Sequence, residues 1–217
     1  LDALNPRTAG REIPTGKLTE RDAWVVTLVS LALLAVAAAL LNRLTLVLLP
    51  VAVAFLIAYP YTKRFTWACH LWLGVTIGAA AAGGYIAVSG QFTAVAWLLW
   101  LGVAAWIGGF DVVYGVLDLE FDLRNGVHSV PARFGVPAAL RAAAGAHVVT
   151  VLALAAVPLF APLGAGYWAA LGLTACVLLG EHVALARHDV GAVLAAFNVN
   201  MVVGPVMLLG IVLGLAW

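Results

Sequence analysis

The chain has 217 residues, a formal net charge of +1 and a mean hydropathy of +1.07. Soluble domains carry about 25% charged residues, whereas this chain carries 10%, so it has too little polar surface to coat a soluble globule. The net charge near zero provides no basic patch, so no nucleic-acid partner is expected. The two cysteines, Cys69 and Cys176, lie in or beside apolar stretches without metal-ligand spacing, which favours small buried side chains over a metal or disulfide framework.

The chain opens on a polar segment, residues 1–22, that contains Asn5-Pro6 and several charges. Asn-Pro ends any preceding helix, so we expect this segment to be a loop that caps one membrane face. No signal peptide is readable, and the first residue is Leu1 instead of Met. We therefore expect the chain to begin within a longer protein.

Seven apolar stretches follow. They are residues 23–42, 44–60, 70–88, 93–117, 137–160, 164–186 and 191–216. A membrane span needs roughly 20 apolar residues, and most of the stretches meet that length. They are too uniformly apolar for barrel strands, in which apolar and polar residues alternate. The sequence predicts an all-α fold, a multi-pass transmembrane helical bundle that forms a single domain over residues 1–217, with the lipid bilayer as its surroundings.

The loop charges indicate the orientation of the bundle. If residues 1–22 are cytoplasmic and the spans alternate, ten of the eleven Lys and Arg residues lie on the cytoplasmic side, and Arg43 alone lies opposite. This asymmetry is what the positive-inside rule requires. Most acidic residues lie on the same side, and the opposite loops are nearly uncharged. We therefore predict a cell-membrane protein whose chemistry takes place at the cytoplasmic face.

Two cations end the second span, in the sequence Tyr59-Pro-Tyr-Thr-Lys63-Arg64. Arg binds phosphate oxygens through a bidentate fork and Lys binds them as a point charge. Both residues are also what a topology anchor requires. On these residues alone, a phosphate clamp and a membrane anchor stay open.

The fourth span ends in an acidic stripe. At 100° per residue, Asp111, Tyr114, Asp118 and Asp122 lie within about 80° of one helix face, and Glu120 points roughly the opposite way. Asp118 and Asp122 are one turn apart and repel each other unless a cation lies between them. Oxygen ligands suit Mg²⁺, and an ionisable group inside a span such as Asp111 is a candidate functional residue. The alternative is that Asp118 and Asp122 only mark the solvated end of a helix.

The next loop, residues 118–136, is long and polar, and we place it on the cytoplasmic side. Its sequence Leu123-Arg-Asn-Gly-Val-His-Ser-Val-Pro-Ala-Arg-Phe-Gly135 contains His128, a candidate for positioning a substrate or a proton. A single loop histidine has neither role in many proteins.

Together these segments resemble the UbiA superfamily of intramembrane prenyltransferases, and the resemblance runs through essentially the whole chain. The family has two aspartate-rich motifs at one membrane face. The second, Asp-x-x-x-Asp, matches Asp118 and Asp122, and the Tyr-x-x-x-Lys element matches Tyr59 and Lys63. Asp2, ahead of the family-like loop Asn5-Pro-Arg-Thr-Ala-Gly-Arg-Glu, matches the last residue of the first motif. Members typically have nine transmembrane helices, so the resemblance implies that two N-terminal helices and the other first-motif ligands lie upstream of this chain.

The resemblance implies two Mg²⁺ ions that bridge the aspartates and the diphosphate of an isoprenoid. Asp118 and Asp122 would hold one ion, and Asp2 with upstream partners the other. The expected diphosphate ligands are the nearby cations Lys63, Arg64, Arg7 and Arg11. Either Tyr114 or Asp111 would orient the acceptor or stabilise the allylic cation. The expected substrate contacts are Tyr59, His128 and Ser129.

The loops look most like quinone-pathway members, specifically 4-hydroxybenzoate polyprenyltransferases. The implied partners are a prenyl diphosphate and a small aromatic acceptor, either 4-hydroxybenzoate or a hydroxynaphthoate. Haem-modifying, chlorophyll-modifying and archaeal lipid-forming relatives stay open, as does a non-catalytic lipid-binding relative. A transporter that uses Asp111 and Glu181 as an ion relay is the alternative from another class, but transporters favour midplane charges and internal repeats, which this sequence lacks.

Overall fold

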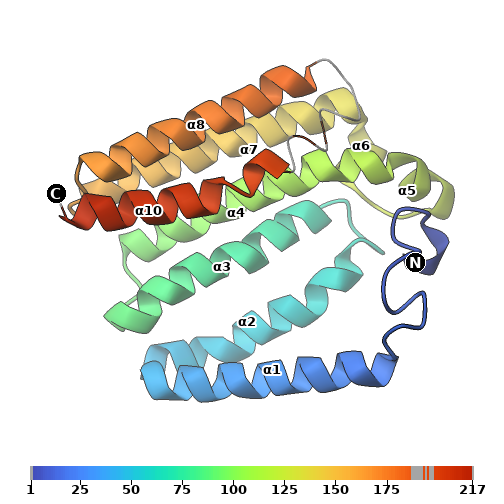
Figure 1. Cartoon of the computed structure of the whole chain (residues 1–217), viewed down its shortest axis with the longest axis horizontal. Coiled ribbons are helices and arrows are strands. Elements are labelled where there is room, and N and C mark those ends of the chain that lie inside the picture. Colours follow the sequence, from blue (N-terminus) through green and yellow to red (C-terminus); the bar gives the residue numbers. More distant parts are fainter. Residues whose placement is uncertain (1, 187–192, 194, 196–197, 217) are drawn as a thin grey trace. The chain divides into compact units, whose positions relative to one another are not determined.

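The computed structural model describes the chain apart from residues 1, 187–192, 194, 196–197 and 217, and apart from the side chains of residues 2 and 216. The described residues form helices and connecting turns, with no strand among them (Figure 1). This confirms the predicted all-α fold. The first residues of the predicted span 191–216 lie outside the described residues, as do the loop charges Arg187 and Asp189.

In this part of the chain, seven segments are long and apolar enough to cross a membrane. They are Glu20–Leu41, Arg43–Thr62, Cys69–Ser89, Ala94–Asn125, Val136–Leu159, Ala165–Leu185 and Asn198–Leu215. Each overlaps one predicted apolar stretch, and most ends differ by a few residues. The protein is an integral membrane protein.

The residues cluster into two compact units, Leu1–Pro50 and Val51–Trp217. The first unit contains a short 3₁₀ helix η1 (Asp2–Leu4) and helix α1 (Glu20–Leu41). Thr19 begins α1 through a capping box, since its hydroxyl accepts from the Asp22 N–H and the Asp22 carboxylate accepts from the Thr19 N–H. Helix α2 (Arg43–Thr62) starts in the first unit and ends in the second.

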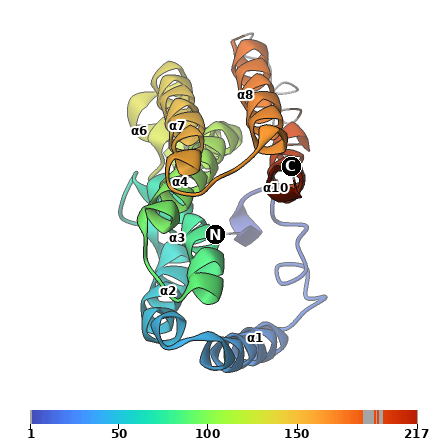
Figure 2. The ribbon, with the colours of Figure 1, turned by 90° about the vertical axis from the view of Figure 1, so that its left-hand side faces the viewer.

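The second unit contains the remaining helices. They are α3 (Cys69–Ser89), α4 (Ala94–Gly115), η2 (Val116–Asp118), α5 (Leu119–Asn125), α6 (Val130–Phe134), α7 (Val136–Ala156), η3 (Val157–Leu159), α8 (Ala165–Leu185) and α10 (Val203–Ala216). Helix α4 packs against α3 on one side and α7 on another, and α8 packs against both α7 and α10 (Figures 1 and 2). Helix α4 therefore lies between α3 and α7.

Small residues bring α3 and α4 into backbone contact. A Cβ on Gly74 would lie 2.2 Å from the Ala104 carbonyl oxygen, and one on Gly78 would lie 2.7 Å from the Ala104 nitrogen. These positions exclude any side chain, so the glycines allow the close approach of two helices that is common in membranes. The same approach holds the acidic end of α4 beside the start of α3, where a Cβ on Gly108 would lie 3.3 Å from the His70 carbonyl oxygen.

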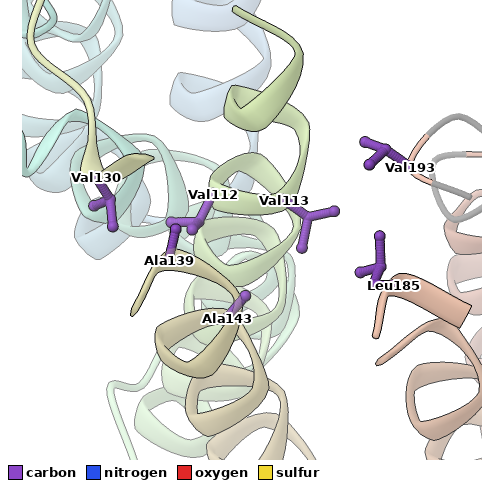
Figure 3. Packing of buried hydrophobic residues seen from close by; sticks show 7 residues of the cluster. All are labelled: Val112, Val113, Val130, Ala139, Ala143, Leu185 and Val193. Carbon is purple, nitrogen blue, oxygen red and sulfur yellow. The ribbon is translucent and has the colours of Figure 1, made fainter. Parts of the chain in front are cut away.

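A cluster of buried apolar side chains packs the C-terminal part of α4 against its neighbours. Val112 points toward Ala139 and Ala143 of α7, and Val113 points toward Leu185 and Val193 (Figure 3). A second cluster forms near the other end of α7, where Leu154 packs against the buried Tyr167 and Leu171 of α8. The first cluster therefore packs the acidic end of α4 against its neighbours, and the second packs the opposite end of the bundle.

The acidic stripe does not lie on one uninterrupted helix, as its analysis at 100° per residue assumed. Helix α4 ends at Gly115, a 3₁₀ turn occupies Val116–Asp118, and α5 begins at Leu119. The tighter turn has about 120° per residue instead of 100°, so over three residues it rotates the stripe by only about 60° more. Asp111 and Asp118 therefore stay within about 40° of each other, but the arc that contains all four predicted residues widens from about 80° to about 140°.

Candidate active site

Lys63 and the two aspartates of the second motif form one charged cluster. The Lys63 Nζ lies 3.6 Å from Asp118 Oδ2 and 3.1 Å from Asp122 Oδ1. Asp118 is 8% exposed and Asp122 is fully buried. These burials contradict the alternative that the two carboxylates mark the solvated end of a helix. The positive charge that the structure places between them is the Lys63 ammonium, and the expected divalent cation stays a prediction.

The backbone around this cluster explains its geometry. Asp118 ends the 3₁₀ turn and Asp122 lies one turn later on α5, which places both carboxylates on one side of a short helix. Gly126 ends α5 with φ of 63°, a left-handed conformation that favours glycine. The chain then turns back, and the His128 N–H donates to the Lys63 carbonyl at 2.9 Å. The loop thus fixes the backbone of the lysine relative to the aspartates.

The site has the donor atoms that a magnesium ion requires. Asp122 Oδ2 is buried and has no hydrogen-bond donor among the described residues, so one carboxylate oxygen is available to a ligand. No group of three or more His, Cys, Asp or Glu side chains is assembled in the described ranges. Mg²⁺ commonly takes one or two protein carboxylates and fills its other positions with phosphate oxygens and water. Two carboxylates beside a lysine therefore fit a metal-bound diphosphate better than an all-protein metal site.

Asp111 lies deeper on α4 and pairs with a residue that the sequence analysis did not select. The His70 Nδ1 donates to Asp111 Oδ2 at 2.7 Å. The imidazole is 4% exposed and the carboxylate 29% exposed. Tyr114, half-buried, stacks on Phe110 with ring centroids 6.5 Å apart. A polar residue at the very start of an apolar span was the one sequence signal for His70.

The other predicted residues of this unit have diverse surroundings. The guanidinium of Arg64 lies over the exposed Tyr61 ring, 5.3 Å from its centroid, and does not lie between the aspartates as Lys63 does. Tyr59 is half-buried and the His128 side chain is exposed. Ser129 is fully buried, and its hydroxyl caps α6 by accepting from the Ala132 N–H at 3.3 Å. Ser129 thus has a structural task in shaping the loop.

Asp2, Arg7 and Arg11 belong to the first unit. Asp2 begins η1, and both arginines are exposed. The buried Asn5 organises this segment, because its Oδ1 accepts from the Arg7 N–H at 3.0 Å. The assignment of these three residues to the metal and diphosphate site stays a prediction.

A second polar cluster, which the sequence analysis touched only through Glu181, lies inside the bundle. The Trp106 Nε1 donates to Asn200 Oδ1 at 2.8 Å, and Asn200 Nδ2 donates to the Glu181 carboxylate. His147 and His182 form a ring-nitrogen hydrogen bond of 2.9 Å between α7 and α8. Burial favours such pairing, because each group would be costly to leave without a partner in an apolar bundle.

Comparisons with known proteins identify the family of this chain. Residues 1–204 match the family described as the UbiA prenyltransferase family. The chain belongs to the UbiA prenyltransferase family. It is 34% identical over its whole length to the 4-hydroxybenzoate octaprenyltransferase of Xanthomonas campestris pv. campestris, of which it spans 71%. It is 36% identical to the enzyme of the same name from Xanthomonas oryzae pv. oryzae, with 97% of the chain and 70% of the relative covered.

Solved structures of relatives support the same assignment. This UbiA family member superposes on the UbiA homolog from Aeropyrum pernix K1 with a TM-score of 0.88 and 34% identity, covering 98% of the chain and 79% of that structure. The structure described as that of digeranylgeranylglyceryl phosphate synthase in membranes gives a TM-score of 0.73 at 20% identity, which shows a shared fold. The expectation of a membrane prenyltransferase is confirmed, and the transporter alternative is not supported.

Proposed function

We propose that this protein transfers a polyprenyl group from a prenyl diphosphate to a small aromatic acid, 4-hydroxybenzoate or a hydroxynaphthoate, and releases diphosphate. The reaction depends on Mg²⁺ and takes place at the cytoplasmic face of the cell membrane. The observation that carries the proposal is the placement of Lys63 between the buried Asp118 and Asp122. The names of the similar Xanthomonas proteins support the aromatic acceptor.

Each charged residue has a defined task in this reaction. Asp118 and Asp122 would hold a magnesium ion, which would supply positive charge that makes the diphosphate a better leaving group. Lys63 has a 31% exposed side chain, so its ammonium can reach diphosphate oxygens without leaving the cluster. When the bond between the first prenyl carbon and the diphosphate oxygen breaks, its electron pair leaves with the diphosphate. A cation already in place stabilises the charge that develops there.

The remaining predicted residues complete this proposal. As the family resemblance implies, Asp2 would contribute to a second magnesium ion, and Arg7, Arg11 and Arg64 would supply further positive charge for the diphosphate. Tyr59 and the exposed His128 contact the substrates near the membrane surface. The apolar helices keep water from the allylic cation and surround the isoprenoid tail. The excess of basic loop residues on one side supports the cytoplasmic orientation.

Substitution of one motif aspartate in the protein, reconstituted in membranes, tests the proposal. Assays combine prenyl diphosphates of several lengths with 4-hydroxybenzoate or a dihydroxynaphthoate, with Mg²⁺ or with EDTA. We expect the wild type to form prenylated acceptor and diphosphate only with Mg²⁺. Asp118→Asn should lower kcat on the order of 100-fold or more, because half of the carboxylate charge at the metal is removed.

Glu120→Gln is the matched control. Glu120 lies on the same short helix, but its exposed side chain pairs with Arg124 one turn away, and such surface pairs contribute about 0.5 kcal/mol or less. Its turnover should match that of the wild type. Full turnover of Asp118→Asn, or of the wild type in EDTA, would contradict the metal role. Transfer to neither aromatic acceptor by the wild type would contradict the proposed acceptor class.

A further inference from the structure

The pair formed by His70 and Asp111 joins two helices and lies apart from the charged cluster around Lys63. The residues are 41 positions apart in the chain, and their hydrogen bond is 2.7 Å long. Among the described residues, His70 is the one side chain that bonds to the Asp111 carboxylate. The imidazole is almost completely buried, whereas the carboxylate keeps 29% of its surface exposed. The histidine thus lies behind an aspartate that is open to a ligand.

The surrounding backbone leaves room for the imidazole. A Cβ on Gly115 would lie 2.9 Å from His70 Cε1, and a Cβ on Gly108 would lie 3.3 Å from the His70 carbonyl oxygen. A larger residue at Gly115 would displace the ring, and one at Gly108 would press against the His70 backbone. The His70 Nε2 is buried and has no hydrogen-bond partner in the described part of the protein, so Asp111 is the group that compensates burial of this polar ring.

Asp111 also lies at a suitable distance from the diphosphate site. Four α-helical and three 3₁₀ residues separate it from Asp118, which corresponds to roughly 10–12 Å along the helix axis. Both carboxylates lie within about 40° of the same face. The reacting prenyl carbon is one bond from the diphosphate, and the acceptor ring lies next to that carbon. A group that removes a proton from the ring must therefore lie about one ring further into the span, where Asp111 is.

We propose that Asp111 is the base that removes the ring proton of the aromatic acceptor, and that His70 is a positioning residue that holds the Asp111 carboxylate in place. The inference rests on the proposed function. The bond between the prenyl carbon and the diphosphate oxygen breaks and its electron pair leaves with diphosphate. A ring electron pair forms the new carbon–carbon bond. The ring C–H bond then breaks, its electron pair restores aromaticity, and the proton moves to Asp111 Oδ1. No oxidant or reductant is required.

The arrangement suits this step for two physical reasons. A span that excludes water cannot supply a solvent base, so the protein must provide one. The hydrogen bond from His70 Nδ1 engages Oδ2 and leaves Oδ1 for the ring proton. A general base must lie within hydrogen-bond reach of the proton that it removes. A purely structural bond between α3 and α4 is the competing role for His70, and the following experiment separates the two.

The test compares acceptors that carry hydrogen or deuterium at the ring carbon that is prenylated. The enzymes are the wild type, Asp111→Asn, His70→Gln and His70→Ala. In the wild type, loss of diphosphate limits the rate, and we expect an isotope effect on kcat near unity. In Asp111→Asn, kcat should fall on the order of 100-fold or more and a primary isotope effect should appear, because proton removal becomes limiting. His70→Ala should show a smaller fall with a raised isotope effect, and His70→Gln, which retains a donor, should recover part of the loss.

Acceptor binding without Mg²⁺ and without the prenyl donor is measured as a second readout. Asp111→Asn and His70→Gln should bind the acceptor with nearly the wild-type Kd, since the proposed role lies in turnover. Thr76→Val is the control on α3, because Thr76 is buried but donates to the Trp72 carbonyl of its own helix. The Thr76→Val enzyme should show an isotope effect on kcat near unity, as the wild type does.

Three outcomes overturn parts of this reasoning separately. If the wild type prenylates the acceptor but no Asp111 or His70 variant gains an isotope effect, the base assignment is wrong. If Kd rises in proportion to the loss of kcat/KM, the pair binds the acceptor and does not remove its proton. If the wild type prenylates no aromatic acceptor, the proposed function itself fails.

Discussion

Gly74 offers a quantitative test of the contact between α3 and α4. A methyl group at this position would lie 2.2 Å from the Ala104 carbonyl oxygen, where ordinary contact begins at 3.4 Å, so the helices must separate by about 1.2 Å. The obstacle is backbone, which cannot rotate away as a flexible side chain does. Gly74→Ala should therefore open this interface.

The magnitude follows from two opposing effects. Overpacking of this kind costs about 1–3 kcal/mol. Replacing a helical glycine by alanine returns about 0.5–1 kcal/mol. The expected net loss is centred near about 1 kcal/mol and is at most about 2.5 kcal/mol; the central value corresponds to a fall in Tm of about 2–4 °C for a chain of this size. Turnover should fall as well, because His70 lies one turn before Gly74 and a shift of that size breaks its 2.7 Å bond to Asp111.

Thermal unfolding in detergent, followed by tryptophan fluorescence, measures the effect. Gly83→Ala is the matched control on the same helix, since a methyl group there would meet nothing within 4 Å. Its Tm should equal that of the wild type or lie slightly above it. A Gly74→Ala protein that melts with Gly83→Ala and keeps full turnover would refute the close backbone packing.

Two further substitutions test buried hydrogen bonds. Tyr167→Phe removes the hydroxyl that donates to the Leu154 carbonyl at 2.7 Å. This variant should lose about 0.5–1.5 kcal/mol of stability and keep its turnover. An unchanged Tm would show that the bond contributes nothing. Trp106→Phe removes the donor to Asn200 and should destabilise the protein by about 1 kcal/mol in the same melting assay. Trp24→Phe, at a position 63% exposed, is its control and should leave Tm unchanged; equal Tm values for the two tryptophan variants would contradict the role of the Trp106 bond.

Local patterns in the sequence predicted much of the site. Asp118 and Asp122 were recognised because a spacing of four places two carboxylates on one helix face whatever the rest of the chain does. Asp118 stays within about 40° of Asp111 because the 3₁₀ turn Val116–Asp118 rotates the chain by only about 60° more than an α-helix, whereas Asp122 moves to about 80° from Asp111. The role of Lys63 was left open between anchor and clamp, since a sequence does not show what an ammonium group faces.

Other contacts were not readable from the sequence for the same reason. Arg64 lies over Tyr61, and the Ser129 hydroxyl caps α6. The expected roles of Arg64 at the diphosphate and of Ser129 at the substrate stay predictions. His70 was overlooked, because a histidine that starts an apolar span is recognisable as functional only when its partner on another helix is known.

The sequence by itself determined the membrane bundle, its seven candidate spans and the acidic end of the fourth. These features depend on hydropathy and on spacing within one helix, which neighbouring residues define. Only the tertiary structure decided that Lys63 lies between Asp118 and Asp122, that His70 supports Asp111, and that Trp106, Asn200 and Glu181 form a chain of bonds. Each of these depends on which faces of separate helices meet, and that is set by side-chain packing and by glycines such as Gly74 that let two backbones touch.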